Sequence, residues 1–386
     1  MKKLNTVLIL LVMAALALSA CAPASTPTPA ASQAPAATQA PAATQAPAAT
    51  EAPAATQAPA ATQAPAATQA PAATQAPAAG GKTFKVAVVM PSAVNDLAFS
   101  QSMFDALTAI QKEMGADKFE FKYSENMFNV DDAAAAIRDY ASKGYDLVIA
   151  HGSQYGSSLV EIAPDFPKTS FAWGTTVDTF TDKGVKNVFA YEARAEEGGY
   201  VNGIVAAMLS KSGVIGVVGP IETGDAKLYV DGFKAGVASV NPKAKVNVSW
   251  IQSFSDTAKA AAAAKAHVDA KADALTGTAQ MVVGAIGVAK DNNIPWFGTQ
   301  SNQTSLAPTV VVASQVYKWD VVLKQIISLI QGGTLGGKSF PINLQNKGEV
   351  IEFNPAYKLP DAVTKAAQDA IQGISSGTVK ITLPTQ

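Results

Sequence analysis

The chain has 386 residues, one cysteine and a formal net charge of −1 at pH 7, with 29 Lys and Arg against 30 Asp and Glu. This balance argues against a strongly basic nucleic-acid-binding protein, and a single cysteine excludes an internal disulfide. The chain is long enough to form one large hydrophobic core or two linked ones.

The N-terminus has the pattern of an export signal. Lys2 and Lys3 precede an apolar run over residues 7–18, whose length is typical of a signal peptide and short for a membrane span. The run ends in Leu18-Ser19-Ala20-Cys21, which is similar to a lipobox, with Cys21 as the site of lipidation. We expect a signal peptide over 1–20 and a protein anchored by lipid on the outer face of the cell membrane, hence periplasmic if an outer membrane exists. An ordinary secretory signal with a chance cysteine is the alternative.

A low-complexity segment follows. The unit Gln-Ala-Pro-Ala-Ala-Thr repeats from Gln33 to Ala79, with Glu51 in place of Gln once. Proline in every unit blocks regular helix and sheet, and the segment has no large apolar residues to bury. Residues 21–81 are therefore predicted to be the lipidated cysteine and a disordered tether, with a reach on the order of 40 Å as a coil.

From Lys82 onwards, short β-branched runs alternate with amphipathic helical patterns. The first half has predicted strands at 84–90, 119–123, 145–150, 169–173 and 188–191, and predicted helices at 99–115, 131–143, 158–163 and 196–210. The second half has predicted strands at 214–218, 245–251 and 309–313, shorter elements at 282–288 and 296–297, and predicted helices at 227–240, 256–272 and 320–330. An extended stretch at 340–354 and a last helix at 361–374 complete the chain.

Two series of strand–helix units predict two doubly wound parallel sheets with right-handed crossovers. One lobe is expected to comprise residues 82–192 and about 317–350, and the other residues 193–316 and about 351–386. Ligands bind beyond the carboxyl ends of the strands in such sheets, so a cleft between the lobes is the expected site.

The predicted strand ends carry aromatic, amide and hydroxyl side chains and few paired charges. This composition suits a neutral, planar solute held between rings and hydrogen-bonded at its edges, and it also suits a sugar. The residues predicted to bind the solute are Asp96, Phe99, Ser100, His151, Gln154, Trp173, Glu222, Tyr229, Thr276, Gln300, Lys318 and Trp319.

Four segments resemble the basic membrane protein family of ABC-transporter substrate-binding lipoproteins. They are the segments Asn95–Ser102, Arg194–Gly203, Asp231–Gly236 and Ser253–Asp256. The resemblance implies a type I periplasmic-binding-protein fold with a three-segment hinge, and several family members bind purine nucleosides. It makes Phe99 and Tyr229 candidates for stacking on a base.

Two departures from the family pattern affect the ribose end of the expected ligand. Gln300-Ser301-Asn302-Gln303 lacks the carboxylate that would bind a ribose, and Tyr317 stands where the nucleoside binders have a lysine, with Lys318 one position later. A free base or another planar solute therefore fits as well as a nucleoside.

Several local patterns are weaker. Gly373-Ile374-Ser375-Ser376-Gly377 matches a nucleophile elbow, but no strand precedes it and no histidine follows it, so a helix-ending turn is predicted. His267 is expected at the surface of its helix, and His151 is either a ligand contact or a structural group. Neither a cofactor nor a metal site is predicted.

The resulting hypothesis is a monomeric, non-enzymatic solute-binding lipoprotein that delivers its solute to the permease and ATPase subunits of an ABC importer. A receptor lipoprotein that senses a sugar, a flavin or a signal molecule is the alternative. An exported hydrolase is the third possibility considered, and it lacks a coherent set of catalytic residues in the sequence.

Overall fold

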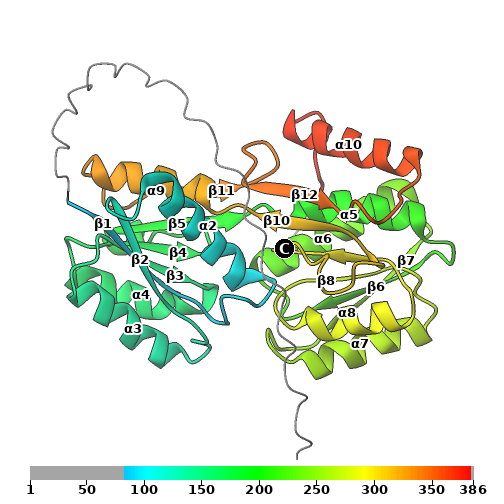
Figure 1. The fold of residues 1–386 in the computed structure, drawn as a ribbon, viewed down its shortest axis with the longest axis horizontal. Helices are drawn as coiled ribbons and strands as arrows, with labels where there is room; N and C mark the ends of the chain where they lie inside the picture. Colours follow the sequence, from blue (N-terminus) through cyan, green and yellow to red (C-terminus); the bar gives the residue numbers. More distant parts are fainter. Residues whose placement is uncertain (1–81, 384–386) are drawn as a thin grey trace, which may run out of the picture. The chain divides into compact units, whose positions relative to one another are not determined.

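The computed structural model describes residues 82–383, which form two lobes, each built on a six-stranded sheet (Figure 1). The predicted signal peptide, Cys21 and the repeat tether lie outside the described residues. None of the helices within 82–383 combines the length and the apolar character needed to cross a membrane.

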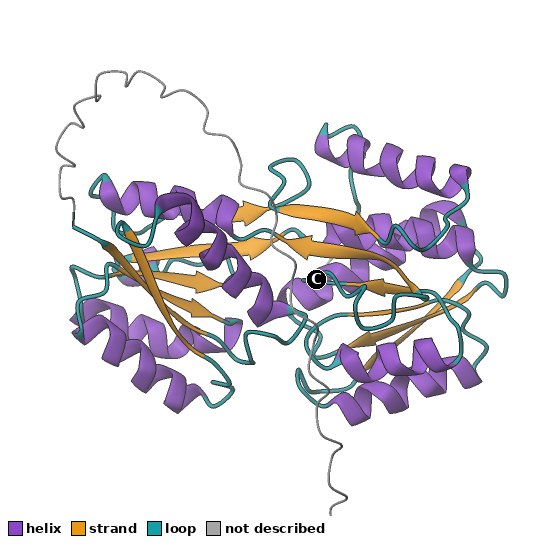
Figure 2. Ribbon diagram, in the orientation of Figure 1, coloured by secondary structure: helices purple, strands orange, loops and turns teal. Residues whose placement is uncertain are grey.

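Lobe 1 has the strand order β11-β5-β4-β3-β1-β2, with every neighbouring pair parallel. Its strands are β1 (Phe84–Val89), β2 (Phe119–Ser124), β3 (Leu147–His151), β4 (Ser170–Gly174), β5 (Val188–Ala193) and β11 (Ser339–Ile342). Its α-helices are α2 (Phe99–Met114), α3 (Val130–Ser142), α4 (Gly156–Ile162) and α9 (Asp320–Gln331). Helices cover both faces of the sheet, because α2 packs with α9 and α3 packs with α4 (Figure 2).

Lobe 2 has the order β12-β10-β9-β8-β6-β7. Its strands are β6 (Val214–Gly219), β7 (Lys245–Trp250), β8 (Leu275–Gly277), β9 (Trp296–Gly298), β10 (Val311–Tyr317) and β12 (Glu349–Phe353). Its helices are α5 (Ala195–Leu209), α6 (Gly224–Val240), α7 (Thr257–Asp269), α8 (Val282–Asp291) and α10 (Asp361–Ser375). The pair β10–β12 is antiparallel and the other pairs are parallel. The predicted α/β class with two doubly wound, mainly parallel sheets is thus confirmed.

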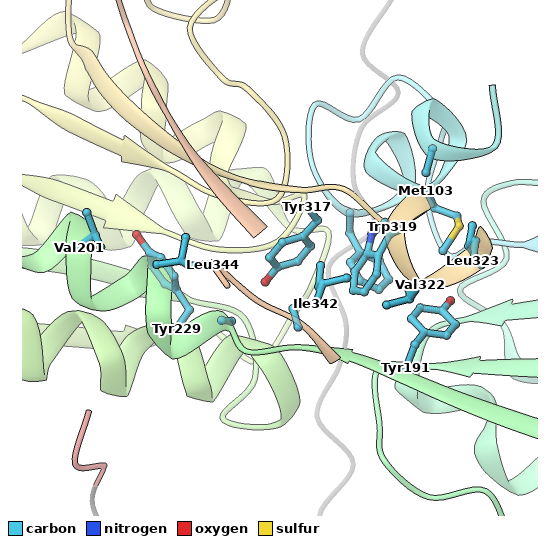
Figure 3. Close-up of a cluster of buried hydrophobic side chains, with 14 of the residues drawn as sticks. Met103, Tyr191, Val201, Tyr229, Tyr317, Trp319, Val322, Leu323, Ile342 and Leu344 are labelled. Atoms are coloured by element: carbon cyan, nitrogen blue, oxygen red, sulfur yellow. The ribbon is translucent and has the colours of Figure 1, made fainter. Parts of the chain in front are cut away.

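The chain crosses between the two sheets after β5, after β10 and between β11 and β12. One hydrophobic core continues through these crossings, since it contains buried residues of both lobes. Tyr191, Tyr317 and Trp319 meet there, with the Trp319 ring centroid 5.2 Å from that of Tyr191 and 5.1 Å from that of Tyr317 (Figure 3). Two further cores lie under the α3–α4 and α7–α8 pairs.

Helices α5 and α6 pack backbone against backbone. A Cβ atom on Gly203 of α5 would collide with the carbonyl oxygen of Phe233, and a Cβ atom on Gly236 of α6 would collide with that of Tyr200. Gly199 and Gly232 have the same relation to the facing helix. The glycines of two family-like segments therefore form the two sides of one helix–helix contact, which needs residues without side chains.

Two local predictions have clear outcomes. His267 is predicted at the surface, and this is wrong: its side chain is buried, and Nε2 lies 3.1 Å from the carbonyl oxygen of Val217, because this face of α7 packs on β6. The turn predicted at Gly373–Gly377 is confirmed, since α10 ends at Ser375 and Gly377 adopts a left-handed φ of 74°.

Candidate functional site

A cavity lies between the lobes at the carboxyl ends of their strands. Its empty volume, counted together with the open space at its mouth, is about 490 Å³. Lobe 1 contributes Pro91, Phe99, Phe128, Gly152, Ser153, Gln154 and Thr175. Lobe 2 contributes Thr223, Gly224, Asp225, Ala226, Phe254, Ala279, Gln280 and Gln300. Three phenylalanines and three glutamines give the cavity flat apolar faces and amide edges.

Phe99, the first residue of α2, has a fixed ring. The ring stacks on His151 with a centroid distance of 3.8 Å and an interplanar angle of 7°, and Trp319 meets it edge-on at 6.5 Å. His151 Nε2 also lies 3.2 Å from the Phe99 carbonyl oxygen. The side of Phe99 that faces the cavity is therefore a rigid platform on which a planar solute can stack.

His151 itself is fully buried behind Phe99. Its Nδ1 is 2.8 Å from the hydroxyl of Tyr191, so Nε2–H donates to the Phe99 carbonyl and Nδ1 accepts from Tyr191. Burial lowers the pKa of His151 to about 3, against the partial effect of the Phe99 carbonyl. The imidazole is neutral at physiological pH and acts as a support for the ring of Phe99.

The start of α2 joins the two lobes. Asp96 accepts hydrogen bonds from the backbone N–H groups of Ala98, Ser100 and Gln101, and burial raises the pKa of its carboxyl. Ser92 Oγ lies 2.6 Å from Ser100 Oγ and accepts a hydrogen bond of 2.9 Å from Gln280 of lobe 2. The side chains of this loop thus fix the N-terminus of α2 and contact the opposite lobe.

Asp225, in the first turn of α6, is the one ionisable residue among the described residues that line the cavity. Its carboxylate faces Thr175 Oγ1 of lobe 1 at 3.4 Å, Gln300 Nε2 at 3.5 Å and the Tyr317 hydroxyl at 3.3 Å. Burial raises the pKa of this carboxyl, and these hydrogen bonds oppose the rise. The electrostatic character of the cavity is therefore neutral to negative.

The sequence-predicted residues divide into two groups. Phe99, Gln154 and Gln300 line the cavity. The remaining nine do not line it, and they are Asp96, Ser100, His151, Trp173, Glu222, Tyr229, Thr276, Lys318 and Trp319.

Most residues of the second group support the walls. Trp173 donates from Nε1 to the carbonyl of Gly152, and the Tyr229 hydroxyl lies 2.7 Å from Thr276 Oγ1 inside lobe 2. Trp319 donates to Ser102 Oγ at 2.9 Å. Glu222 and Lys318 form ion pairs with Lys227 and Glu352, respectively.

Sequence reasoning missed Phe128 and Phe254. They follow β2 and β7, the edge strands of the two sheets, and none of the predicted site residues follows either of these strands directly. Applying the carboxyl-end rule to every strand would have found both. Asp225 is also absent from the predicted site residues, since an acidic residue at the start of a helix is equally typical of a helix cap.

Comparisons with known proteins agree with this architecture. The family model described as ABC transporter substrate-binding protein PnrA-like matches residues 83–383. A purine-binding protein of Brucella abortus (strain 2308) is 30% identical over 293 residues, which cover 76% of this chain and 81% of that protein. The ABC transporter nucleoside-binding protein BmpA of Lactococcus lactis subsp. cremoris (strain MG1363) is 27% identical over 328 residues, with 78% and 89% covered.

A solved solute-binding protein of an ABC transporter system from Conexibacter woesei (DSM 14684) superimposes with a TM-score of 0.64 at 23% identity. The match covers 78% of this chain and 99% of the solved one. It confirms the type I periplasmic-binding-protein fold that the sequence resemblance implies. The chain belongs to the Bmp family of PnrA-like ABC transporter substrate-binding proteins.

Proposed function

We propose that this substrate-binding protein captures a purine base or purine nucleoside in the cavity between its lobes and delivers it to the permease of an ABC importer. The observation that carries the proposal is the Phe99 platform, held by His151 and facing a cavity edged with amide and hydroxyl groups. Flat aromatic faces with polar edges match a flat heterocycle with hydrogen-bonding edges.

The relatives support the same ligand class. Purine binding and nucleoside binding are the roles named for the Brucella and Lactococcus proteins, which share 30% and 27% identity with this chain. Phe99, Gln154 and Gln300 contact the solute in this proposal. The other predicted site residues around the cavity, such as His151 and Trp319, hold the walls in place.

Anchoring and partners complete the proposal. Lipid on Cys21 holds the protein, a monomer, at the outer face of the membrane, and the tether over residues 22–81 lets the binding domain reach the permease. Lobe closure around the solute gives the permease a surface that differs between the empty and loaded forms. Incorporation of radiolabelled palmitate into wild-type protein and its loss in Cys21→Ser tests the anchor.

A thermal-shift panel tests the ligand class. The panel contains adenine, adenosine, a pyrimidine nucleoside, riboflavin and glucose. A ligand at 100 times its dissociation constant stabilises the protein by about 2.7 kcal/mol, which is a shift of a few degrees for a protein of this size. Shifts with the purines alone support the proposal. A shift with glucose or riboflavin and none with the purines would overturn the ligand assignment.

A further inference from the structure

The cavity has an end that contains hydrogen-bond acceptors in excess of donors. Asp225 and Gln300 lie together there, and Thr175 and Tyr317 flank the carboxylate. The contacts to Asp225 are 3.3–3.5 Å long, whereas hydrogen bonds between an N–H or O–H group and a carboxylate are normally about 2.5–2.9 Å long. A carboxylate offers about four lone-pair positions, so Asp225 keeps acceptor capacity on its cavity side.

Gln300 provides an independent sign of a missing partner. The residue is only 3% exposed, and its Oε1 has no hydrogen-bond partner among the described residues, while Nε2 lies 3.5 Å from Asp225. The backbone of Gln300 has a φ of 68°, in the left-handed region that non-glycine residues seldom adopt. Such conformations concentrate at binding sites, where the surrounding structure holds them.

A buried acceptor without a donor, such as Gln300 Oε1, is unfavourable in the empty protein, and a carboxylate that receives only long hydrogen bonds, such as Asp225, is incompletely satisfied. The solute removes this penalty if it presents hydrogen-bond donors to that end of the cavity. No Lys, Arg or His side chain is among the described residues that line the cavity. An anionic solute would therefore meet a carboxylate without a compensating cation.

We infer that Asp225 and Gln300 form the recognition edge for the hydrogen-bond donors of a solute without negative charge, and that Asp225 is a specificity-determining residue. This inference rests on the proposed function, because it concerns the ligand of the same cavity. A purine nucleoside has two sources of such donors: the exocyclic amino group of the base and the hydroxyl pair of the ribose.

Isothermal titration calorimetry on the complete chain, purified in detergent, separates these sources. The proteins are wild type, Asp225→Asn and the control Asp182→Asn, which removes the same charge from an exposed residue of lobe 1. The ligands are adenosine, purine riboside, which lacks the amino group, and 2′,3′-dideoxyadenosine, which lacks both hydroxyls of the pair.

We expect Asp225→Asn to weaken adenosine binding about 10- to 100-fold, the range for loss of a hydrogen bond to a charged group. Asp182→Asn should bind adenosine like wild type. The analogue that lacks the donor group bound by Asp225 should bind wild type and Asp225→Asn with nearly equal affinity. If that analogue is purine riboside, the donor is the amino group of the base, and if it is 2′,3′-dideoxyadenosine, the donor is the hydroxyl pair of the ribose.

Two results overturn the inference and leave the proposed function intact. One is that Asp225→Asn binds adenosine as tightly as wild type. The other is that it weakens all three nucleosides by the same factor, since Asp225 then recognises neither donor group. If wild type binds none of the purine ligands, the proposed function fails, and the inference fails with it.

Discussion

His151 lies at the end of β3, and its protonation state determines how the ring of Phe99 is held. Its neutral ring accepts from Tyr191 and donates to the Phe99 carbonyl. Protonation would place a buried charge between two aromatic rings and turn the Nδ1 acceptor into a donor. The neighbours that face this imidazole are Phe99, Tyr191 and Trp319, and none of these carries a charge at neutral pH.

This geometry predicts a pH-dependent contribution to stability. The pKa of His151 is about 3 in the folded protein and about 6.5 when the chain is unfolded. Between these values the unfolded state binds more protons, so stability falls as the pH falls. Relative to His151→Phe, the free energy of unfolding of wild type should decrease by up to about 1.4 kcal/mol per pH unit below pH 6.

Urea denaturation of both proteins at pH 7, 6 and 5 measures this difference. His267 is present in both proteins, so its own titration cancels. A difference between wild type and variant that stays constant over this pH range would contradict the assignment of a buried, neutral His151.

The carboxylate of Asp225 leads to a second prediction, which concerns the affinity for an anionic ligand. Among the described residues, the cavity lining has this carboxylate and no cationic side chain. Like charges brought together in a closed site cost several kcal/mol. AMP, which carries a phosphate, should therefore bind at least about 100-fold more weakly than adenosine. Competition of AMP against adenosine in titration calorimetry measures the ratio. Equal affinity for AMP and adenosine would show that the phosphate avoids the cavity or that a cation enters it.

At the scale of helices, the α5–α6 contact should tolerate no added side chain. Gly203→Ala places a methyl group against the backbone carbonyl of Phe233, which cannot move aside like a side chain. The expected loss is about 1–3 kcal/mol of unfolding free energy. Gly287→Ala in α8 is the matched control, because a Cβ atom there meets nothing within 4 Å, and it should stabilise the protein by about 0.5–1 kcal/mol.

Denaturant unfolding of the two variants tests this packing. Equal stabilities for Gly203→Ala and wild type would mean that α5 and α6 can move apart at little cost. This result would contradict a close backbone contact between the two helices.

The crossing segments share a buried carboxyl. Glu349, the first residue of β12, accepts from the Gly198 N–H at 2.6 Å and from Gln315 Nε2 at 2.8 Å, and burial raises its pKa well above the usual range. These contacts connect the starts of α5 and β12 with β10. Glu349→Ala leaves both donors unpaired and should cost about 2–4 kcal/mol of stability, while Glu349→Gln keeps an acceptor and should cost less.

Chemical denaturation ranks the two variants against wild type. If Glu349→Ala is as stable as Glu349→Gln, the hydrogen bonds of this carboxyl do not hold the crossing segments together.

The sequence predicted the helices and strands better than it predicted which elements pack or pair with one another. Periodicity indicated the alternating strands and helices, because each half-buried element must place its apolar residues at a fixed spacing. It failed for His267, since a helix of small alanines has no clear apolar face and its buried side depends on the strands beneath it. The extended stretch at 340–354 was found, but its division into β11 and antiparallel β12 depends on pairing with β5 and β10.

For the molecule as a whole, the cavity depends on contacts between distant parts of the chain. Asp225 and Gln300 are 75 positions apart, and Asp225 and Tyr317 are 92 apart. The strand-end rule placed Phe99, Gln154 and Gln300 near the cleft, but how the lobes meet decides which side chains line the cavity. His151 and Trp319 also lie at or just after strand ends, and Tyr229 lies in α6, yet all three are buried and do not line the cavity.

Hydrogen bonds connect the two lobes beside the cavity. Gln280 of lobe 2 contacts Ser92 of lobe 1, and Ser301 donates to the carbonyl of Ala98 at 2.8 Å. These hydrogen bonds join residues beside the cavity, so the lobes lie in contact around it. A solute that fills the cavity adds contacts to both lobes and favours the closed arrangement.

The most direct test of this account is titration of adenosine into wild type and Phe99→Ala, with Tyr123→Ala, an exposed aromatic residue outside the cavity, as control. Stacking of a base on an aromatic ring contributes about 1–3 kcal/mol, so Phe99→Ala should weaken binding about 5- to 150-fold while Tyr123→Ala binds like wild type. Equal affinity in wild type and Phe99→Ala would contradict a purine site on this platform.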